Sequence, residues 1–548
     1  MRGRHKTPTK ARHSFGLSLI FIALILHPGC SEETASNNPN TPKDANSEEL
    51  SCFPCAGDFL IEDEAGLVNI RQCSSISGDL QIASSTIRNF RALQDSQCLQ
   101  SIQGSLSISA NPLLTDLDGL QSLTRVQGEI TLRLNPLLNG SEGLSSLETI
   151  DGRVQISSND SLKDIRLLEG IIQLPGGLEI QGNAQLSDIS PLNGLETISG
   201  SLNISDNLAL ESLAGLEQLS MVGKDLTIGN NGALENLSGL ISLKTVTGTF
   251  ALAGNASLRS LEGLSSLVQI DGDLRIGWNP ELKDIRGLQS IQYVGYDLEI
   301  KENESLETLE GPATLQSVGG YIGILGNPVL TQIEGINALS NMPGFLQISD
   351  NDQLKSIRGF DALEELGEWE IKDNASLTEI TGFSKLHTIT GYINWENNTE
   401  LKDLSGVQEL KTVSGDFYID NNPALEELQG LSSLTRVDGF FYIGYNPSLL
   451  SLDSISNLEA VGASLWIGEN DAIKDLNGLA KLSQINDALR IYGNDLLEDL
   501  EGLLALKTLG GELIIRENSS LCEDYANETA SKLPTTGKIT ILDNKVCE

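Results

Sequence analysis

Histidine is almost missing from this sequence. Of the four histidines in 548 residues, three lie in the first 29 positions, and the fourth is His387. This argues against a Ser-His-Asp triad or a Cys-His pair, and it excludes a histidine-rich metal site by count. His387 lies between Leu386 and Ile389 at a position that varies along the chain, so we interpret it as a surface residue. We therefore expect a protein that is not an enzyme.

Long apolar runs are also scarce, and the only one is Phe15–Leu26. Five basic residues precede this run, and the segment "HPGC" follows it and ends at Cys30, so residues 1–29 are expected to be a secretory signal peptide. The cysteine after the cut resembles a bacterial lipobox, although His27 stands where leucine is usual. A plain secretory signal with an incidental Cys30 is the alternative. We predict general export, lipidation at Cys30, and an outer-membrane lipoprotein of a bacterial cell envelope whose only membrane contact is its lipid. The sequence does not choose between a surface-exposed and a periplasmic position.

Aromatic residues and periodicity are absent from Ser31–Leu50, which is polar and is expected to be a disordered tether within the segment 30–50.

Basic residues are few in the whole chain, which has 36 Lys and Arg, 75 Asp and Glu, and a net charge of −39. Nucleic acid and anionic membrane surfaces are polyanions, so both are disfavoured as partners. Cations or basic surfaces are the favoured charge partners.

Cysteine is absent from residues 99–521 and gathers on either side of that gap. Disulfides cap the exposed ends of repeat proteins in oxidising compartments, and we predict that Cys522 pairs with Cys547. Four further cysteines permit three pairings, between which the sequence does not choose. They are Cys52, Cys55, Cys73 and Cys98. Zinc at the Cys52-x-x-Cys55 pair is a disfavoured rival, because no histidine lies nearby and the context is extracytoplasmic.

What the sequence has in abundance is a repeat of 24 residues, which reads G-x-L-x-I-x-x-N-x-x-L-x-x-L-x-G-L-x-x-L-x-x-I-x. The alternation in L-x-I predicts a short strand with one buried face, and the stretches between glycines are too short for stable α-helices. We therefore predict an all-β fold, a right-handed parallel β-helix or solenoid of about 18 or more leucine-rich coils that is disulfide-capped at both ends. Glycine at the eighth place after the asparagine indicates a corner that needs positive φ or close backbone approach.

The asparagine of each unit is expected to stack on that of the next coil, about 4.8 Å away, and to hydrogen-bond the corner. One unit is a residue short, between Asn351 and Asn374. The predicted ladder comprises Asn111, Asn135, Asn159, Asn183, Asn207, Asn231, Asn255, Asn279, Asn303, Asn327, Asn351, Asn374, Asn398, Asn422, Asn446, Asn470, Asn494 and Asn518, with Asn544 as a looser last member.

Units such as "GSLNISDNLALESLAGLEQLSMV" resemble the receptor L domain, a parallel β-helix of growth-factor receptors and fungal cell-wall proteins. The resemblance covers roughly residues 76–521, a longer uninterrupted solenoid than in the receptors, and it implies binding or structure rather than catalysis. It transfers no ligand residue. The predicted organisation after the tether is a cysteine-rich cap and degenerate first coil over 51–100, the solenoid over 101–521, and a C-terminal cap over 522–548, in a monomer.

Aromatic residues make up only 5% of the chain, yet they recur near its C-terminal end at outward strand positions. Tyr418, Tyr442 and Trp466 stand four places before three consecutive ladder asparagines, and Tyr445 and Tyr492 lie nearby. Such a strip indicates a ligand site, because exposed apolar patches often mark binding. A cross-strand aromatic ladder that only stabilises the sheet is the alternative.

Acidic residues recur at the fifth place after the asparagine, and Glu379, Asp403 and Glu427 would stack on adjacent coils. Such a column is a candidate for calcium binding, and a solvated acidic face is the alternative. No other cofactor is expected.

The favoured function is recognition or adhesion at the cell surface through a carbohydrate or protein ligand. A structural envelope spacer is the second hypothesis, and a β-helix polysaccharide lyase or hydrolase, which rests on fold analogy alone, is a remote third.

Overall fold

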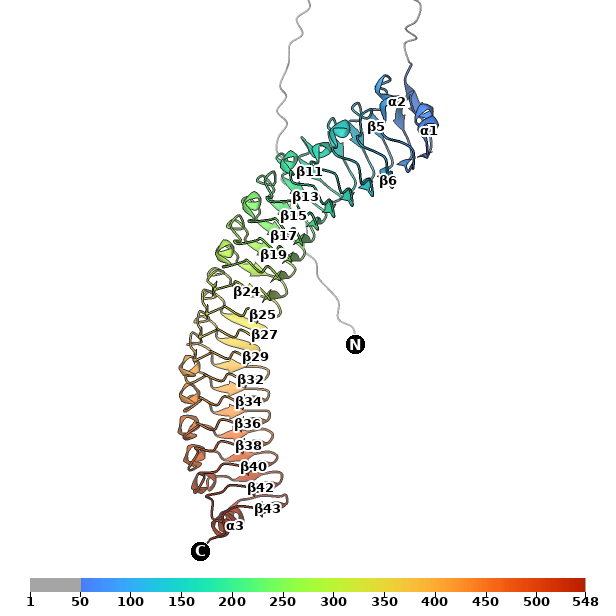
Figure 1. Ribbon diagram of the computed structural model, residues 1–548. Coiled ribbons are helices and arrows are strands. Elements are labelled where there is room, and N and C mark those ends of the chain that lie inside the picture. Colours follow the sequence, from blue (N-terminus) through green and yellow to red (C-terminus); the bar gives the residue numbers. More distant parts are fainter. Residues whose placement is uncertain (1–50, 548) are drawn as a thin grey trace, which may run out of the picture. The chain divides into compact units, whose positions relative to one another are not determined.

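The repeat folds into a parallel β-solenoid, which the computed structural model describes over residues 51–547 (Figure 1). Each coil contributes one L-x-I-x strand to a long parallel sheet, which we call the main sheet. Leu226 of one strand pairs with Phe250 of the next, a register of 24 residues. In the four-residue strands from β6 to β42 the first and third residues are buried in the core, as the alternation predicts. The last strand, β43, has no buried residue. The predicted all-β solenoid is thus confirmed.

The strands of the main sheet are β2 (Phe59–Ile61), β4 (Leu80–Ile82), β6 (Leu106–Ser109), β8 (Ile130–Arg133), β10 (Val154–Ser157), β12 (Leu178–Gln181), β14 (Leu202–Ser205), β16 (Leu226–Gly229), β18 (Phe250–Ala253), β20 (Leu274–Gly277), β22 (Leu298–Lys301), β25 (Ile322–Leu325), β27 (Asn341–Ser349), β29 (Glu365–Lys372), β32 (Ile393–Glu396), β34 (Phe417–Asp420), β36 (Phe441–Gly444), β38 (Leu465–Gly468), β40 (Leu489–Tyr492), β42 (Leu513–Arg516) and β43 (Ile539–Leu542).

A second side of the solenoid is built from shorter parallel strands that precede the main-sheet strands. Its first run is β1 (Phe53–Cys55), β3 (Cys73–Ile76), β5 (Ser101–Ile102), β7 (Arg125–Val126) and β9 (Thr149–Ile150). The second run is β11 (Gln173–Leu174), β13 (Thr197–Ile198), β15 (Met221–Val222), β17 (Thr245–Val246), β19 (Gln269–Ile270), β21 (Tyr293–Val294) and β24 (Ser317–Val318). The third is β31 (Thr388–Ile389), β33 (Thr412–Val413), β35 (Arg436–Val437), β37 (Ala460–Val461), β39 (Gln484–Ile485) and β41 (Thr508–Leu509).

The third side differs from the expected corners, because many coils place a single 3₁₀ turn there. Apolar residues spaced three apart suit this helix, which has three residues per turn. The turns are η1 (Glu142–Leu144), η2 (Arg166–Leu168), η3 (Ser190–Leu192), η4 (Ser238–Leu240), η5 (Arg286–Leu288), η6 (Ser405–Val407), η7 (Gln429–Leu431), η8 (Asp453–Ile455), η9 (Asn477–Leu479) and η10 (Glu501–Leu503). Between them a small sheet takes their place, formed by β23 (Thr308–Leu309), β26 (Gln332–Ile333), β28 (Ser356–Ile357) and β30 (Glu379–Ile380).

The ladder asparagines from Asn111 to Asn518 are fully buried. Asn207 is typical of them. Its Oδ1 accepts hydrogen bonds from the backbone N–H of Asn183 at 3.1 Å and from Nδ2 of Asn183 at 3.2 Å. Its own Nδ2 donates to the carbonyl oxygens of Ile180 at 2.9 Å and Ser205 at 3.0 Å. One side chain thus satisfies buried polar groups on two coils, which answers the requirement that buried backbone groups be paired.

The residue before each ladder asparagine adopts a left-handed backbone conformation, a feature that the sequence pattern did not reveal. In described coils this residue is mostly Gly, Asn, Asp, Glu or Ser, with φ between 51° and 72°. Asparagine, aspartate and glycine tolerate this conformation best. Leu134, Trp278 and Tyr445 are the bulky exceptions.

The shortened coil before Asn374 is accommodated by longer strands. β27 and β29 have 9 and 8 residues, and their register shifts between Met342 and Phe345. Leu346 then pairs with Trp369, an offset of 23 instead of 24. β29 pairs with both β31 and β32, so the two sides of the solenoid join there.

Both described ends carry disulfides, as the cysteine distribution predicts. At the N-terminal end Cys52 pairs with Cys98 and Cys55 with Cys73, beside the short helices α1 (Glu64–Asn69) and α2 (Arg91–Gln94). This is the connectivity that the sequence left open. At the other end Cys522 pairs with Cys547, and α3 (Glu523–Lys532) contacts β43.

The signal peptide, Cys30 and tether fall outside the described residues. Among the helices that are described, none combines the length and apolar character needed to cross a membrane.

Candidate functional site

Four neighbouring main-sheet strands present the predicted aromatic residues on one face. Tyr418 pairs in register with Tyr442, and Tyr442 with Trp466. Tyr492 ends the following strand, β40. All four side chains are half-buried rather than fully exposed, because neighbouring rings and the sheet cover part of each. Together with Phe440, these residues are called the aromatic strip.

Phe440 belongs to the strip but is not apparent from the expected column. It lies two residues before Tyr442 and therefore points to the same side of the sheet. Its ring centroid is 4.8 Å from that of Trp466, nearly perpendicular to it, and 6.1 Å from that of Tyr442. Tyr442 in turn lies 6.5 Å from Tyr418 and 6.4 Å from Trp466, both edge-on. These separations fall within the range of favourable aromatic pairs.

Two glycines explain how the tyrosines lie. A Cβ atom at Gly444 would stand 2.2 Å from the ring of Tyr442, and one at Gly468 would stand 2.3 Å from the ring of Tyr492. Each ring therefore leans over a position without a side chain, in the manner of aromatic side chains that cover glycines in designed sheets. The rings thus lie low on the sheet instead of projecting from it.

Polar groups surround the rings. The Arg490 guanidinium lies 4.3 Å from the Trp466 ring centroid and forms an ion pair with Glu512, and Arg516 lies 5.7 Å from the Tyr492 ring. The hydroxyls of Tyr442 and Tyr492 are 3.4 Å apart. Burial raises the pKa of both tyrosines above its ordinary value.

Carboxylates border the strip on its other side. The Tyr418 hydroxyl donates to Asp416 at 3.1 Å. Burial, followed by repulsion from Glu396, raises the pKa of Asp420. The strip therefore combines apolar ring surface with hydroxyl donors, carboxylate acceptors and paired guanidinium groups. This is the mixture of groups found in small-molecule sites, where a few polar groups orient a ligand on an apolar surface.

Tyr445 lies beside the strip at the left-handed corner, with φ of 51° and half of its surface exposed. Strained conformations of bulky residues persist where the surrounding structure enforces them, and they gather at functional sites. Among the left-handed residues of this region, which also include Asn421 and Glu469, Tyr445 is the bulkiest, and its conformation costs stability.

We expect Tyr445→Asn to raise the free energy of unfolding by about 0.5–1 kcal/mol, because asparagine tolerates the left-handed conformation better than tyrosine does. Chemical denaturation measures this change. The matched control is Asp350→Tyr at the same place of another coil, where φ is 58°, and it should lower stability by a similar amount. Equal stability of Tyr445→Asn and the parent chain would contradict the assignment of strain.

The three acidic residues considered for calcium have protein partners. Glu379 forms an ion pair with Arg358, and Asp403 Oδ1 accepts a hydrogen bond from the backbone N–H of Ser405 at 2.6 Å. Glu427 accepts one from Gln429 at 2.6 Å. Within residues 51–547, no group of three or more Cys, His, Asp and Glu is arranged to hold a metal ion. The carboxylates of this column thus serve local turns and ion pairs.

His387 is half-buried, and its Nδ1 lies 3.0 Å from the hydroxyl of the adjacent Thr388. It lies on the second side of the solenoid, just before β31, whereas the strip is on the main sheet.

Comparison with known proteins supports the fold. Residues 366–461 match the family model of the receptor L domain, which confirms the predicted resemblance over that part of the chain. This segment includes Tyr418, Phe440, Tyr442 and Tyr445. No curated protein matches the chain.

Three solved structures with similarity to this chain are an internalin, a leucine-rich repeat protein and a plant hormone receptor. An internalin from Listeria monocytogenes has 15% identity and a TM-score of 0.28, with 70% of this chain and 83% of that chain covered. A leucine-rich repeat protein from Bacteroides thetaiotaomicron has 13% identity and a TM-score of 0.25, with coverage of 76% and 52%. A plant peptide hormone receptor in complex with its ligand has 11% identity and a TM-score of 0.21, with coverage of 90% and 91%.

Proposed function

We propose that this chain is a recognition protein of the bacterial cell surface, anchored by a lipid at Cys30, that binds carbohydrate through the aromatic strip. The observation that carries the proposal is the arrangement of Tyr418, Phe440, Tyr442, Trp466 and Tyr492 on one outward face of the main sheet.

The geometry of the rings favours carbohydrate over protein as the ligand. Aromatic hot spots at protein interfaces act as anchors that fill pockets of the partner. Tyr442 and Tyr492 instead lean over Gly444 and Gly468 and stay low on the sheet. A low aromatic surface bordered by hydroxyl and carboxylate groups suits a sugar ring, which has apolar C–H faces and a rim of hydroxyls.

The tightness of the ring packing is also what a purely structural ladder would show, and this is the specific support for the spacer hypothesis. The two functions differ in one consequence. A ladder needs the rings only for stability, whereas a binding surface loses its ligand when the rings are removed and the solenoid stays folded.

The test is a binding screen of the full chain, purified in detergent, against immobilised polysaccharides and envelope proteins, with and without calcium. The Tyr442→Ala, Trp466→Ala double variant should lose at least about tenfold in affinity for the polysaccharide that the parent chain binds. Tyr296→Ala is the matched control, because Tyr296 is exposed on the same chain but lies outside the strip.

Loss of stability without loss of binding would favour the spacer. Binding of an envelope protein and of no polysaccharide would overturn the choice of ligand class, and turnover of a polyuronide would favour an enzyme.

A further inference from the structure

A second group of aromatic side chains lies on the main sheet, several coils before the strip. The ring centroids of Tyr321 and Phe345 are 5.6 Å apart, and those of Phe345 and Tyr392 are 5.9 Å apart. All three side chains are half-buried. Each stands six places before a ladder asparagine, which is also the place of Phe440 in the strip. The two groups therefore point to the same face of the same sheet.

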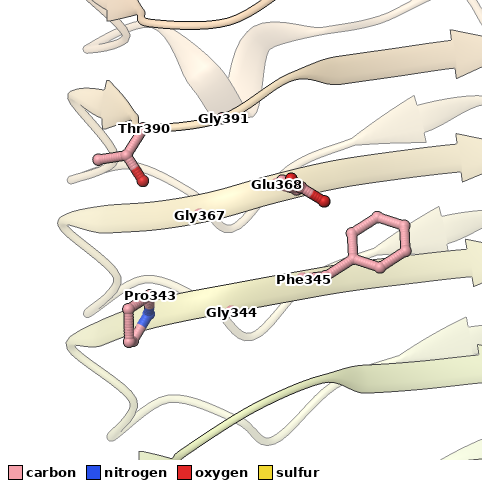
Figure 2. A pocket seen from close by; sticks show the side chains of 7 residues that line it. All are labelled: Pro343, Gly344, Phe345, Gly367, Glu368, Thr390 and Gly391. Carbon is pink, nitrogen blue, oxygen red and sulfur yellow. The ribbon is translucent and has the colours of Figure 1, made fainter.

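A surface depression adjoins this second group. It has a volume of about 360 Å³, within the range of small-ligand sites (roughly 300–1,000 Å³). Figure 2 shows it along β27, β29 and the segment that carries Thr390 and Gly391, with the Phe345 ring at one side and the Glu368 carboxylate above it. Its lining residues are Pro343, Gly344, Phe345, Gly367, Glu368, Thr390 and Gly391.

The depression arises from the shortened coil. Where β27 and β29 extend through the corner, the register shifts between Met342 and Phe345. Three glycines follow one another there on adjacent coils, where an added Cβ would stand 1.8 Å from the backbone of Gly320 at Gly344 and 2.1 Å from that of Pro343 at Gly367. The one-residue deletion, which is unique among the coils from Asn111 to Asn518, coincides with this hollow within the aromatic row.

We propose that the ligand is a linear, uncharged glycan that lies lengthwise along the solenoid, from Tyr321 through the depression to Tyr492. This inference rests on the proposed function and extends it by naming the ligand's shape and charge. Tyr321 and Tyr492 are seven coils apart, which corresponds to about 34 Å at the spacing of adjacent strands. A row of this length has room for about seven sugar units of an extended chain, since one coil rises by about the length of one such unit.

The charges along the row exclude an anionic polymer. Its basic residues are already paired with carboxylates. Lys372 Nζ lies 3.1 Å from Glu396, and Arg490 is paired with Glu512. One coil before the row, Lys301 Nζ lies 2.6 Å from Glu299. A polyanion would meet carboxylates with no free cation to offset them, so its binding would be opposed. The hydroxyls of an uncharged sugar are suited to carboxylate and carbonyl acceptors.

The experiment measures the affinity of the full chain for oligomers of β-1,4-linked glucose and of β-1,4-linked N-acetylglucosamine, from disaccharide to octasaccharide. Affinity for one series should increase with length up to about seven units. Phe345→Ala should lower affinity for the octasaccharide by about tenfold and leave the affinity for the trisaccharide, which is held by the strip, unchanged. Tyr392→Ala provides a second variant of the same group, and Tyr293→Ala, on the second side of the solenoid, provides the control.

The outcomes separate this inference from the proposed function. Affinity that stops increasing at two or three units, and that only the Tyr442→Ala, Trp466→Ala variant abolishes, would overturn the lengthwise mode and leave the strip as a sugar site. If neither series binds at any length, both the lengthwise mode and the proposed carbohydrate site are overturned for this class of uncharged glycan. A preference for sulfated or uronate oligomers would contradict the charge argument.

Discussion

Replacing Asn207 by alanine is expected to lower the free energy of unfolding by about 3–6 kcal/mol. The side chain is fully buried, and its removal takes the acceptor from the backbone N–H and from Nδ2 of Asn183 and a donor from the carbonyl oxygen of Ile180. The carbonyl oxygen of Ser205 also loses a donor but still accepts from the backbone N–H of Gly182 at 3.0 Å. Each buried polar group that loses its partner costs about 1–3 kcal/mol, because water does not reach it. Urea denaturation gives the total change, and hydrogen exchange shows whether the coils on either side of the substitution open together.

The matched control is Asn193→Ala. Asn193 directly follows the 3₁₀ turn η3, is exposed, and has a right-handed backbone conformation. Its replacement should therefore change the free energy of unfolding by less than about 0.5 kcal/mol. Similar effects of the two substitutions would show that the asparagine ladder does not hold the coils together.

Replacing Gly263 by alanine is expected to lower the free energy of unfolding by about 3–5 kcal/mol. Its φ is 109°, a conformation that alanine rarely adopts, and the added Cβ would stand 1.9 Å from the carbonyl oxygen of Leu237 on the preceding coil. The coils must then separate locally or twist, and overpacking of this kind costs about 1–3 kcal/mol in addition to the strain of the backbone. Thermal and chemical denaturation measure the loss.

Gly232→Ala is the control for this prediction, because a Cβ there meets no atom within 4 Å and the backbone is not left-handed. It should be neutral or slightly stabilising, since alanine restricts the unfolded chain. If both glycine substitutions have the same effect, the close approach of the coils at the third side does not explain the glycine at position 263.

Much of the fold was predictable because one pattern recurs with a constant period. The L-x-I strand, the buried asparagine and the glycine corner each depend on residues within one coil or at the same place of the next. The left-handed residue before each asparagine was missed, because Gly, Asn, Asp, Glu and Ser share no obvious class. The 3₁₀ turns were missed because a spacing of three was considered only for an α-helix.

The site was less predictable than the fold. The sequence placed Tyr418, Tyr442 and Trp466 in one column, but their half-buried state depends on Phe440 and on glycines such as Gly444, which lie in other columns. The depression at Phe345 depends on how the strands absorb one missing residue, a rearrangement that no local pattern describes.

The central claim is that the aromatic strip binds a glycan instead of only packing the sheet. The most direct measurement is titration calorimetry of the parent chain, the Tyr442→Ala, Trp466→Ala variant and the Tyr296→Ala control with the polysaccharide found in the screen. We predict that the double variant loses at least about tenfold in affinity while its solenoid stays folded by circular dichroism, and that the control binds as the parent chain does. Unchanged affinity in a folded double variant would contradict the claim and leave the strip as a structural ladder.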